Sequence, residues 1–231
     1  FPFHVKLCLT YMKTSNAQLW LGLKAKRTSL LNAIQKLTGL VTFHGPIARQ
    51  TFTDYTYSAF RSLLMENTAD LELGSPPPFE AGPGRVERDN RVQTLVAGST
   101  SGHLVGGNLS LLVAMLGTAF EPLFDGAILI LEDVDEAPYR IDRMLTHLHL
   151  AGVFQRVNGV VLGKFTNAHT ENPSLSLEEV FAERFHTLSI PVLRGLMIGH
   201  VSDQATLPIG AQAYLDSSKL TLRTAGAYLA D

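Results

Sequence analysis

Cysteine and charge are both scarce in this chain. A single cysteine, Cys8, in 231 residues excludes an internal disulfide framework and a zinc site built from cysteines. The formal net charge of −2 lacks the basic excess that nucleic-acid-binding proteins usually carry. No apolar run reaches the roughly 18 residues that a membrane-spanning helix needs. These absences predict a globular protein that binds neither nucleic acid nor membrane.

The composition is that of a chain able to build a core. Hydrophobic residues make up 45% of it and charged residues 17%, which suits one large domain or two modest ones. A segment rich in glycine and proline, residues 74–84, is typical of a linker or an extended crossing. We therefore place a domain boundary beside it, with residues 1–85 in one domain and residues 86–231 in a second.

Hydrophobic periodicity and turn residues predict an α/β pattern from Thr28 onward. The expected helices cover residues 28–37, 53–64, 109–116, 138–151 and 176–188. The expected strands cover residues 40–43, 92–97, 127–131, 157–163 and 191–194, with small antiparallel strands at 206–209, 212–215 and 220–223. The strands at 127–131 and 157–163, joined through a helix, predict a parallel pair with a right-handed crossover.

The strand at 127–131 is followed at once by four carboxylates, Glu132, Asp133, Asp135 and Glu136. The ends of strands in open α/β sheets are where ligands and catalytic groups lie. A carboxylate there can orient a histidine, bind a cation or simply be solvated at a turn. The acids alone leave these three alternatives open.

Gly106 and Gly107 precede the helix expected at residues 109–116. Glycines before a helix N-terminus let the backbone approach an anionic ligand. Two glycines are a weak signal, however, and a plain turn is the simpler interpretation.

Two of the eight histidines lie near an expected strand end. His200 follows a buried-looking strand and Gly199, as Glu132 follows its own strand. His44 precedes Gly-Pro, where it forms either a pocket wall or a turn. The other six are expected at the surface, on a helix where they cannot pair as ligands, or in the irregular N-terminal segment: His4, His103, His147, His149, His169 and His186. If His200 pairs with Glu132, a base oriented by a carboxylate supplies two-thirds of a hydrolytic triad.

A series of motifs in fixed order resembles the LD-carboxypeptidase family of serine peptidases. These motifs are Leu-Val-Thr-Phe-His-Gly-Pro at 40–46, Gly-Gly-Asn-Leu-Ser-Leu-Leu at 106–112, the run at 129–143, the strand at 159–165, Gly-His at 199–200 and Leu-Pro-Ile-Gly at 207–210. The resemblance extends from about Thr28 to Asp231. It implies a Ser–His–Glu triad in which Glu132 and His200 match the glutamate and the histidine of the family.

The same resemblance implies the rest of the expected biology. The fold would be an N-terminal α/β domain, truncated here, plus a C-terminal α/β domain with a small β-region. The reaction would cleave an amide between an L- and a D-amino acid in the cytoplasm and release terminal D-alanine from a murein tetrapeptide. It implies a homodimer, no metal and no other cofactor.

The chain departs from the family before Thr28. The family carries its nucleophile in a Gly-Tyr-Ser-Asp-like turn a few residues earlier, where this chain reads Leu23-Lys-Ala-Lys-Arg-Thr28. Ala25 is nearest to the nucleophile position, and Ser29 is expected on the first turn of the helix, not on an elbow. The nucleophile is therefore unknown, and we expect little or no peptidase activity. We interpret residues 1–27 as a frame-shifted or misassembled start.

Three functional hypotheses follow from these residues. The first is an LD-carboxypeptidase of peptidoglycan recycling, impaired by the missing turn. The second is a self-immunity peptidase of the same family, which cleaves peptide-nucleotide antibiotics. The third is a non-catalytic peptide-binding protein. A metal hydrolase using the acid cluster is a fourth and weaker hypothesis, because only one histidine is well placed and a hard-cation site needs further oxygen ligands.

Overall fold

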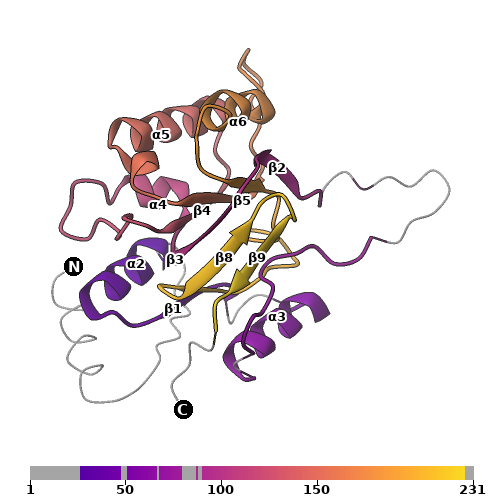
Figure 1. Ribbon diagram of the computed structural model, residues 1–231. Coiled ribbons are helices and arrows are strands. Elements are labelled where there is room, and N and C mark those ends of the chain that lie inside the picture. Colours follow the sequence, from indigo (N-terminus) through magenta and orange to yellow (C-terminus); the bar gives the residue numbers. More distant parts are fainter. Residues whose placement is uncertain (1–26, 48–50, 67, 80–86, 88–89, 227–231) are drawn as a thin grey trace.

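The computed structural model of the chain describes residues 27–47, 51–66, 68–79, 87 and 90–226 (Figure 1). Helices and strands alternate within them, as an α/β fold requires. The helices are α2 (Arg27–Thr38), α3 (Asp54–Leu64), α4 (Leu109–Val113), α5 (Pro138–Leu150), α6 (Leu177–Phe185) and the 3-10 helix η1 (Val153–Gln155). The strands are β1 (Thr42–His44), β2 (Gln93–Val96), β3 (Ser99–Asn108), β4 (Ile128–Val134), β5 (Gly159–Thr166), β6 (Val192–Arg194), β7 (Leu207–Ile209), β8 (Gln212–Asp216) and β9 (Thr221–Thr224).

Seven strands form one mixed sheet in the order β2-β6-β5-β4-β3-β8-β9. Four consecutive strands, β6, β5, β4 and β3, run parallel to one another. The flanking strands β2, β8 and β9 pair antiparallel. β4 is the middle strand of the seven, so its carboxyl end lies where an open α/β sheet presents its ligand site.

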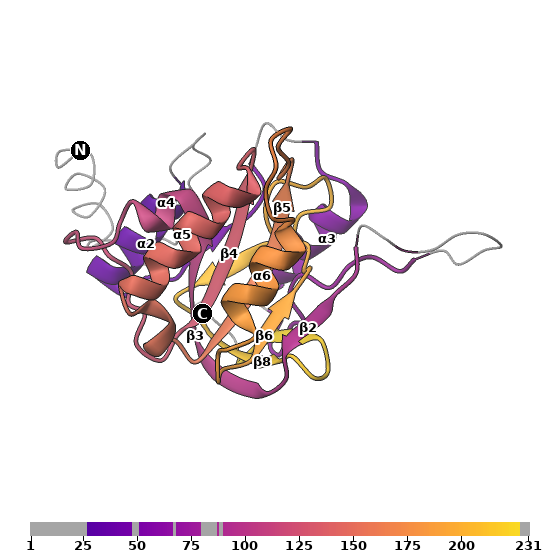
Figure 2. The same cartoon turned by 90° about the horizontal axis from the view of Figure 1, so that it is seen from above.

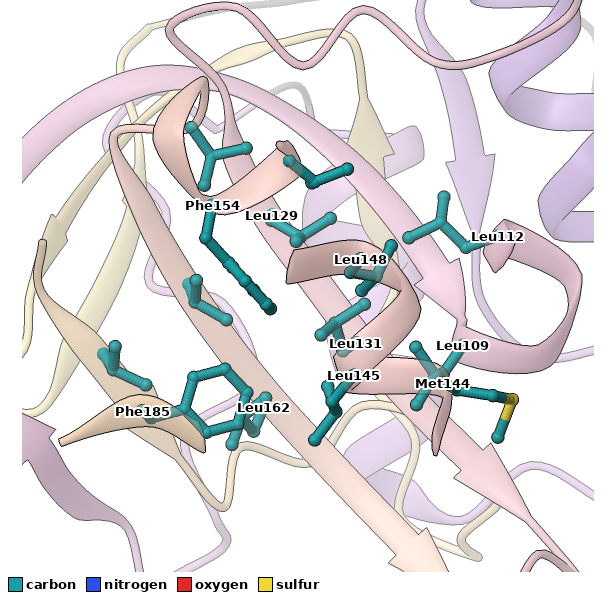
Figure 3. Packing of buried hydrophobic residues seen from close by; sticks show 14 of the residues in the cluster. Leu109, Leu112, Leu129, Leu131, Met144, Leu145, Leu148, Phe154, Leu162 and Phe185 are labelled. Atoms are coloured by element: carbon teal, nitrogen blue, oxygen red, sulfur yellow. The ribbon is translucent and has the colours of Figure 1, made fainter. Parts of the chain in front are cut away.

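The central strand is buried on both faces, as its continuous apolar sequence predicts. Leu129 and Leu131 belong to the core beneath α4, α5 and α6, where they pack with Leu145 and Phe185 (Figure 3). Ile130 belongs to a second core on the opposite face of the sheet. That second core includes residues of β1, α3, β7, β8 and β9, and β8 and β9 curl across it (Figure 1).

The predicted βαβ unit is confirmed. α5 begins with Pro138 at its first turn, buries Ile141 and Leu148, and ends before Gly152, whose φ is 72°. β4 and β5 then pair in parallel. α5 and α6 lie side by side over these strands (Figure 2), and α6 begins with the predicted capping box of Ser176 and Glu179. These elements confirm most of the sequence prediction for the second half of the chain.

The predicted turn at Gly106 and Gly107 is wrong, because both residues lie inside β3. Their φ angles are 116° and 127°, and a Cβ on Gly106 would come within 2.2 Å of the carbonyl oxygen of Ile130 on β4. Only glycine allows this close approach of two neighbouring strands. The helix that follows is also shorter than expected, since α4 ends at Val113.

The predicted apolar face of α2 needs correction. Leu31 and Ile34 are buried as expected, but Leu37 is 47% exposed and the polar Asn32 is buried in its place. The Asn32 side chain donates to the carbonyl oxygen of Gly106 at 2.8 Å and accepts from the Gly106 N–H at 3.0 Å. The Asn32 amide hydrogen-bonds both the N–H and the C=O of Gly106, which offsets the cost of burying a polar side chain. These two bonds hold α2 against β3.

Replacing Asn32 with Ala is therefore expected to destabilise the fold by about 2 to 4 kcal/mol. The substitution removes both hydrogen bonds and leaves a buried N–H and a buried C=O of β3 without their partner. Urea unfolding followed by circular dichroism measures the change. Leu37→Ala on the exposed side of the same helix is the matched control, and it should stay within about 0.5 kcal/mol of the parent. Equal free energies of unfolding for the two variants would show that the Asn32 side chain does not stabilise the contact between α2 and β3.

The small strands of the tail are confirmed as antiparallel, but they do not form a separate β-region. β8 and β9 extend the main sheet beyond β3, whereas β7 pairs with β1 near the start of the described chain. The N-terminal and C-terminal segments thus share one two-stranded sheet, in which His44 lies opposite Leu207. The division into domains at residue 85 stays a prediction. No helix in the described ranges combines the length and apolarity needed to cross a membrane.

Candidate active site

The carboxylate of Glu132 and the imidazole of His200 are in hydrogen-bond contact. Glu132 Oε2 lies 2.9 Å from His200 Nδ1. An ionised carboxylate only accepts hydrogen bonds, so the contact places a hydrogen on Nδ1, and the neutral ring then has its lone pair on Nε2. The Glu132 side chain is 1% exposed, whereas that of His200 is 57% exposed. The predicted contact is confirmed, with the acid enclosed and the base open to solvent. The predicted strand-end positions need correction, because Glu132 lies inside β4, near its carboxyl end, and His200 lies in the loop after β6.

Gly199 is the residue that allows this approach. Its φ is 115°, and a Cβ there would lie 2.9 Å from Glu132 Oε2. The backbone at Gly199 can therefore pass close to the Glu132 carboxylate. The next residue, His200, is thereby placed with its side chain in contact with that carboxylate. Glycine before the histidine is a steric requirement of the pair.

Gly199→Ala is expected to destabilise the protein more than Gly117→Ala and to weaken the contact between Glu132 and His200. Both glycines have positive φ, which costs a residue with a Cβ about 1 to 2 kcal/mol. A Cβ at Gly117 meets nothing within 4 Å, so its variant isolates that backbone cost. The excess for Gly199→Ala, about 1 to 3 kcal/mol in urea unfolding, reports the clash with the carboxylate together with the less favourable φ of 115° at Gly199 compared with 70° at Gly117. Equal losses in the two variants would show that Gly199 is not packed as described.

The other three acids of the predicted cluster, one in β4 and two after it, contact different partners. Asp133 is buried and accepts from the side chains of Asn108 and Ser110 at 2.7 and 2.6 Å, and from the backbone N–H of Ser110 at 3.0 Å. It therefore fastens the start of α4 to β4. This is a structural task that the sequence pattern alone did not assign.

Asp135 and Glu136 are held near the surface. Asp135 accepts from the Asn167 side chain at 2.9 Å, and Glu136 lies 3.5 Å from the Arg140 guanidinium one turn along α5. The four carboxylates thus point to four separate sets of neighbours. Within the described ranges, no group of three histidine, cysteine or acidic side chains is placed to hold a metal ion. The arrangement of these partners does not support the metal-hydrolase hypothesis.

His44 lies on the other side of the same carboxylate. It ends β1, is 9% exposed, and places Nε2 3.8 Å from Glu132 Oε1. A pocket wall or a turn was expected here, and sequence reasoning did not connect His44 with Glu132. The available signal was its position inside the Leu-Val-Thr-Phe-His-Gly-Pro motif at residues 40–46.

The remaining candidates lie away from this centre or outside the described residues. Ser29 is half-buried on the first turn of α2, as predicted. His103 contacts the carbonyl oxygen of Leu123 through Nε2 at 2.7 Å. Four histidines are exposed: His147, His149, His169 and His186. His4 and Ala25 fall outside the described residues, so the nucleophile position is among the predictions that the structure does not test.

A polar pocket of about 590 Å³ adjoins the His200 segment. It lies between β2, β5, β6 and α6, and its lining includes Lys164, Arg194 and Val201. The Lys164 N–H donates to the Ile198 carbonyl at 2.7 Å, so the pocket shares its wall with the loop that carries His200. A hydrogen bond from Arg194 at 2.7 Å holds the pKa of Glu178 below its usual value. Sequence reasoning missed this pocket, because its lining comes from four separate elements.

The architecture defines the chain first as a mixed α/β protein with a curled mixed sheet and a carboxylate–imidazole pair near the end of its middle strand. Residues 101–215 match the family model described as the LD-carboxypeptidase C-terminal domain. The chain belongs to the LD-carboxypeptidase family.

Named relatives agree with this assignment. The chain is 37% identical over 201 residues to the probable murein peptide carboxypeptidase of Bacillus subtilis, covering 84% of this chain and 59% of the relative. It is 28% identical over 220 residues to the microcin C7 self-immunity protein MccF of Escherichia coli, covering 87% and 64%.

Solved structures show the same fold. The structure of MccF in complex with glutamyl sulfamoyl guanosine superimposes with a TM-score of 0.76 at 26% identity, covering 89% of this chain and 67% of that one. The muramoyltetrapeptide carboxypeptidase of Oxalobacter formigenes gives a TM-score of 0.69 at 28% identity, covering 85% and 64%. The chain thus spans about three-fifths of the length of the curated relatives that it matches.

Proposed function

We propose that this chain carries the base and the acid of an LD-carboxypeptidase active site, with His200 as the base and Glu132 as the residue that orients it. The contact of 2.9 Å between Glu132 Oε2 and His200 Nδ1 carries the proposal. A buried carboxylate behind an exposed imidazole is the arrangement in which the outer ring nitrogen takes a proton from a nucleophile.

The chemistry assigned to each residue follows from its surroundings. Nε2 of His200 would accept the proton of an attacking serine hydroxyl and later return it to the leaving amine. Glu132 would stabilise the imidazolium formed in between, and its effect is strong because the carboxylate is shielded from water. Backbone N–H groups would bind the oxyanion. No metal enters the proposed reaction.

The proposed substrate is a murein tetrapeptide, cleaved at the amide between an L-amino acid and the terminal D-alanine. The names of the relatives from Bacillus subtilis and Oxalobacter formigenes support it. The pocket beside His200 offers both charged and aromatic groups, Lys164, Arg194 and Phe181, to a peptide with ionised ends. Action in the cytoplasm and a homodimeric assembly belong to the same proposal.

We further propose that the chain as it stands turns over little or no substrate. Ala25 takes the place nearest to the family's serine, and loss of a triad nucleophile costs on the order of 10⁶ in turnover. A non-catalytic peptide-binding role is then the outcome if binding persists without cleavage.

A self-immunity peptidase is the second candidate. MccF shares the fold with a TM-score of 0.76, and its structure holds glutamyl sulfamoyl guanosine, an aminoacyl nucleoside analogue. The same pair of Glu132 and His200 would serve both reactions, so geometry does not separate them. The distinction lies in the substrate.

Mass spectrometry of products provides the test. The chain is incubated separately with murein tetrapeptide and with a peptide-nucleotide antibiotic, and binding of each is measured by calorimetry. Release of D-alanine alone supports the carboxypeptidase, and cleavage of the antibiotic alone supports the self-immunity peptidase. Binding of tetrapeptide without any product supports the non-catalytic role. Failure to bind or cleave either compound would contradict the proposal.

A further inference from the structure

The second oxygen of the Glu132 carboxylate has a neighbour of its own. Oε2 is occupied by His200, whereas Oε1 has no hydrogen-bond donor within reach among the described residues. The group that faces Oε1 is the imidazole of His44, with Nε2 at 3.8 Å. The buried carboxylate is thus flanked by two imidazoles, one exposed and one enclosed.

The fold places His44 there through long-range contacts. Pairing of β1 with β7 sets His44 opposite Leu207. A Cβ on Gly107 would come within 3.1 Å of His44 Cδ2 and 2.7 Å of Thr28 Oγ1, so β3 passes close to the ring and to the start of α2. These neighbours are uncharged, and Glu132 is the carboxylate that the ring faces. A ring enclosed in this way has little freedom to turn from the acid.

We infer that His44 is a positioning residue: its Nε2–H, directed at Glu132 Oε1, holds the carboxylate with Oε2 toward His200. The inference rests on the proposed function, because it gives His44 a task in presenting the base. A buried carboxylate oxygen without a donor is unfavourable, and closing the gap of 3.8 Å by about 1 Å would complete a hydrogen bond. With Oε1 fixed, rotation of the carboxylate away from His200 Nδ1 is opposed. The tautomer of His200 that exposes an unprotonated Nε2 is then maintained.

The test uses the full chain labelled with ¹⁵N-histidine, because the tautomer of His200 is visible without turnover. Two variants separate donation from packing. His44→Gln keeps an N–H at a similar reach, and His44→Leu keeps volume but has no donor. Wild type and His44→Gln are expected to show His200 protonated at Nδ1, with a downfield Nδ1–H resonance. His44→Leu is expected to lose that resonance and to show mixed tautomers.

Circular dichroism establishes that each variant is folded. If His44→Leu does not fold, His44→Asn replaces it, because its shorter amide cannot span the distance to Oε1, and the same loss is expected. Retention of the Nδ1–H resonance in a folded variant that lacks a donor in reach would overturn the inference. Equal loss in folded His44→Gln would overturn it as well, since ring packing would then be the cause. An inactive chain in the peptide assay leaves this readout unchanged, so failure of the proposed function is recognised separately.

Discussion

Rewriting residues 23–26 as Gly-Tyr-Ser-Asp is expected to raise D-alanine release from murein tetrapeptide by up to about 10⁶-fold. The variant carries Leu23→Gly, Lys24→Tyr, Ala25→Ser and Lys26→Asp, and so introduces the nucleophile turn that the resemblance implies before α2. The gain is large because a base and an acid without a nucleophile cannot form an acyl-enzyme. Initial rates of D-alanine release, measured by mass spectrometry, give the ratio.

The matched control for this variant carries Leu23→Gly, Lys24→Tyr and Lys26→Asp but keeps Ala25. It has the same altered turn without a hydroxyl, and it should be as inactive as the parent chain. If both variants gain equal activity, a serine at position 25 is not the nucleophile. If neither gains any, restoring this turn is insufficient to complete the site around Glu132 and His200.

Replacing Glu132 with Gln in the restored variant is expected to lower kcat by about 10⁴-fold. The amide has almost the same shape as the carboxylate, but it carries no charge to stabilise the His200 imidazolium. Its NH₂ group can also face Nδ1, which would put the hydrogen on Nε2 and leave no lone pair for the nucleophile. Steady-state kinetics on material shown to be folded measures the loss.

Glu136→Gln in the same background is the control for loss of a nearby carboxylate. Glu136 follows the same strand but contacts Arg140 near the surface, so its replacement should change kcat by no more than a few-fold. A kcat for Glu132→Gln within a few-fold of that of the restored variant would remove Glu132 from the mechanism, whatever its distance from His200.

Much of the second half of the fold could be predicted because its signals are local. Residues 127–131 show burial on both faces, Pro138 marks the first turn of α5, and Ser176 with Glu179 gives a capping box. Each signal depends on residues close together in the chain. The strand-end position of Glu132 followed from the same local pattern.

The features that the sequence did not predict depend on contacts between residues that are distant in the chain. β3 reads as polar and rich in glycine, and its strand conformation comes from β4 beneath Gly106 and from Asn32 on α2. The approach of His44 to Glu132 requires β1 to pair with β7 across most of the sequence. A hydrophobic pattern contains no information of this kind. The contact between Glu132 and His200 was expected because both residues were placed at strand ends and because the resemblance to the family implied a triad that includes them.

Soaking crystals of the unaltered chain with murein tetrapeptide shows directly whether the Glu132–His200 pair faces the amide to be cleaved. With the proposed loss of the nucleophile, the peptide should remain intact. The account predicts the amide of the terminal D-alanine beside His200 Nε2, with Glu132 Oε2 still about 2.9 Å from Nδ1. A peptide bound away from His200, or a Glu132 side chain turned from the imidazole with each facing separate solvent, would contradict it.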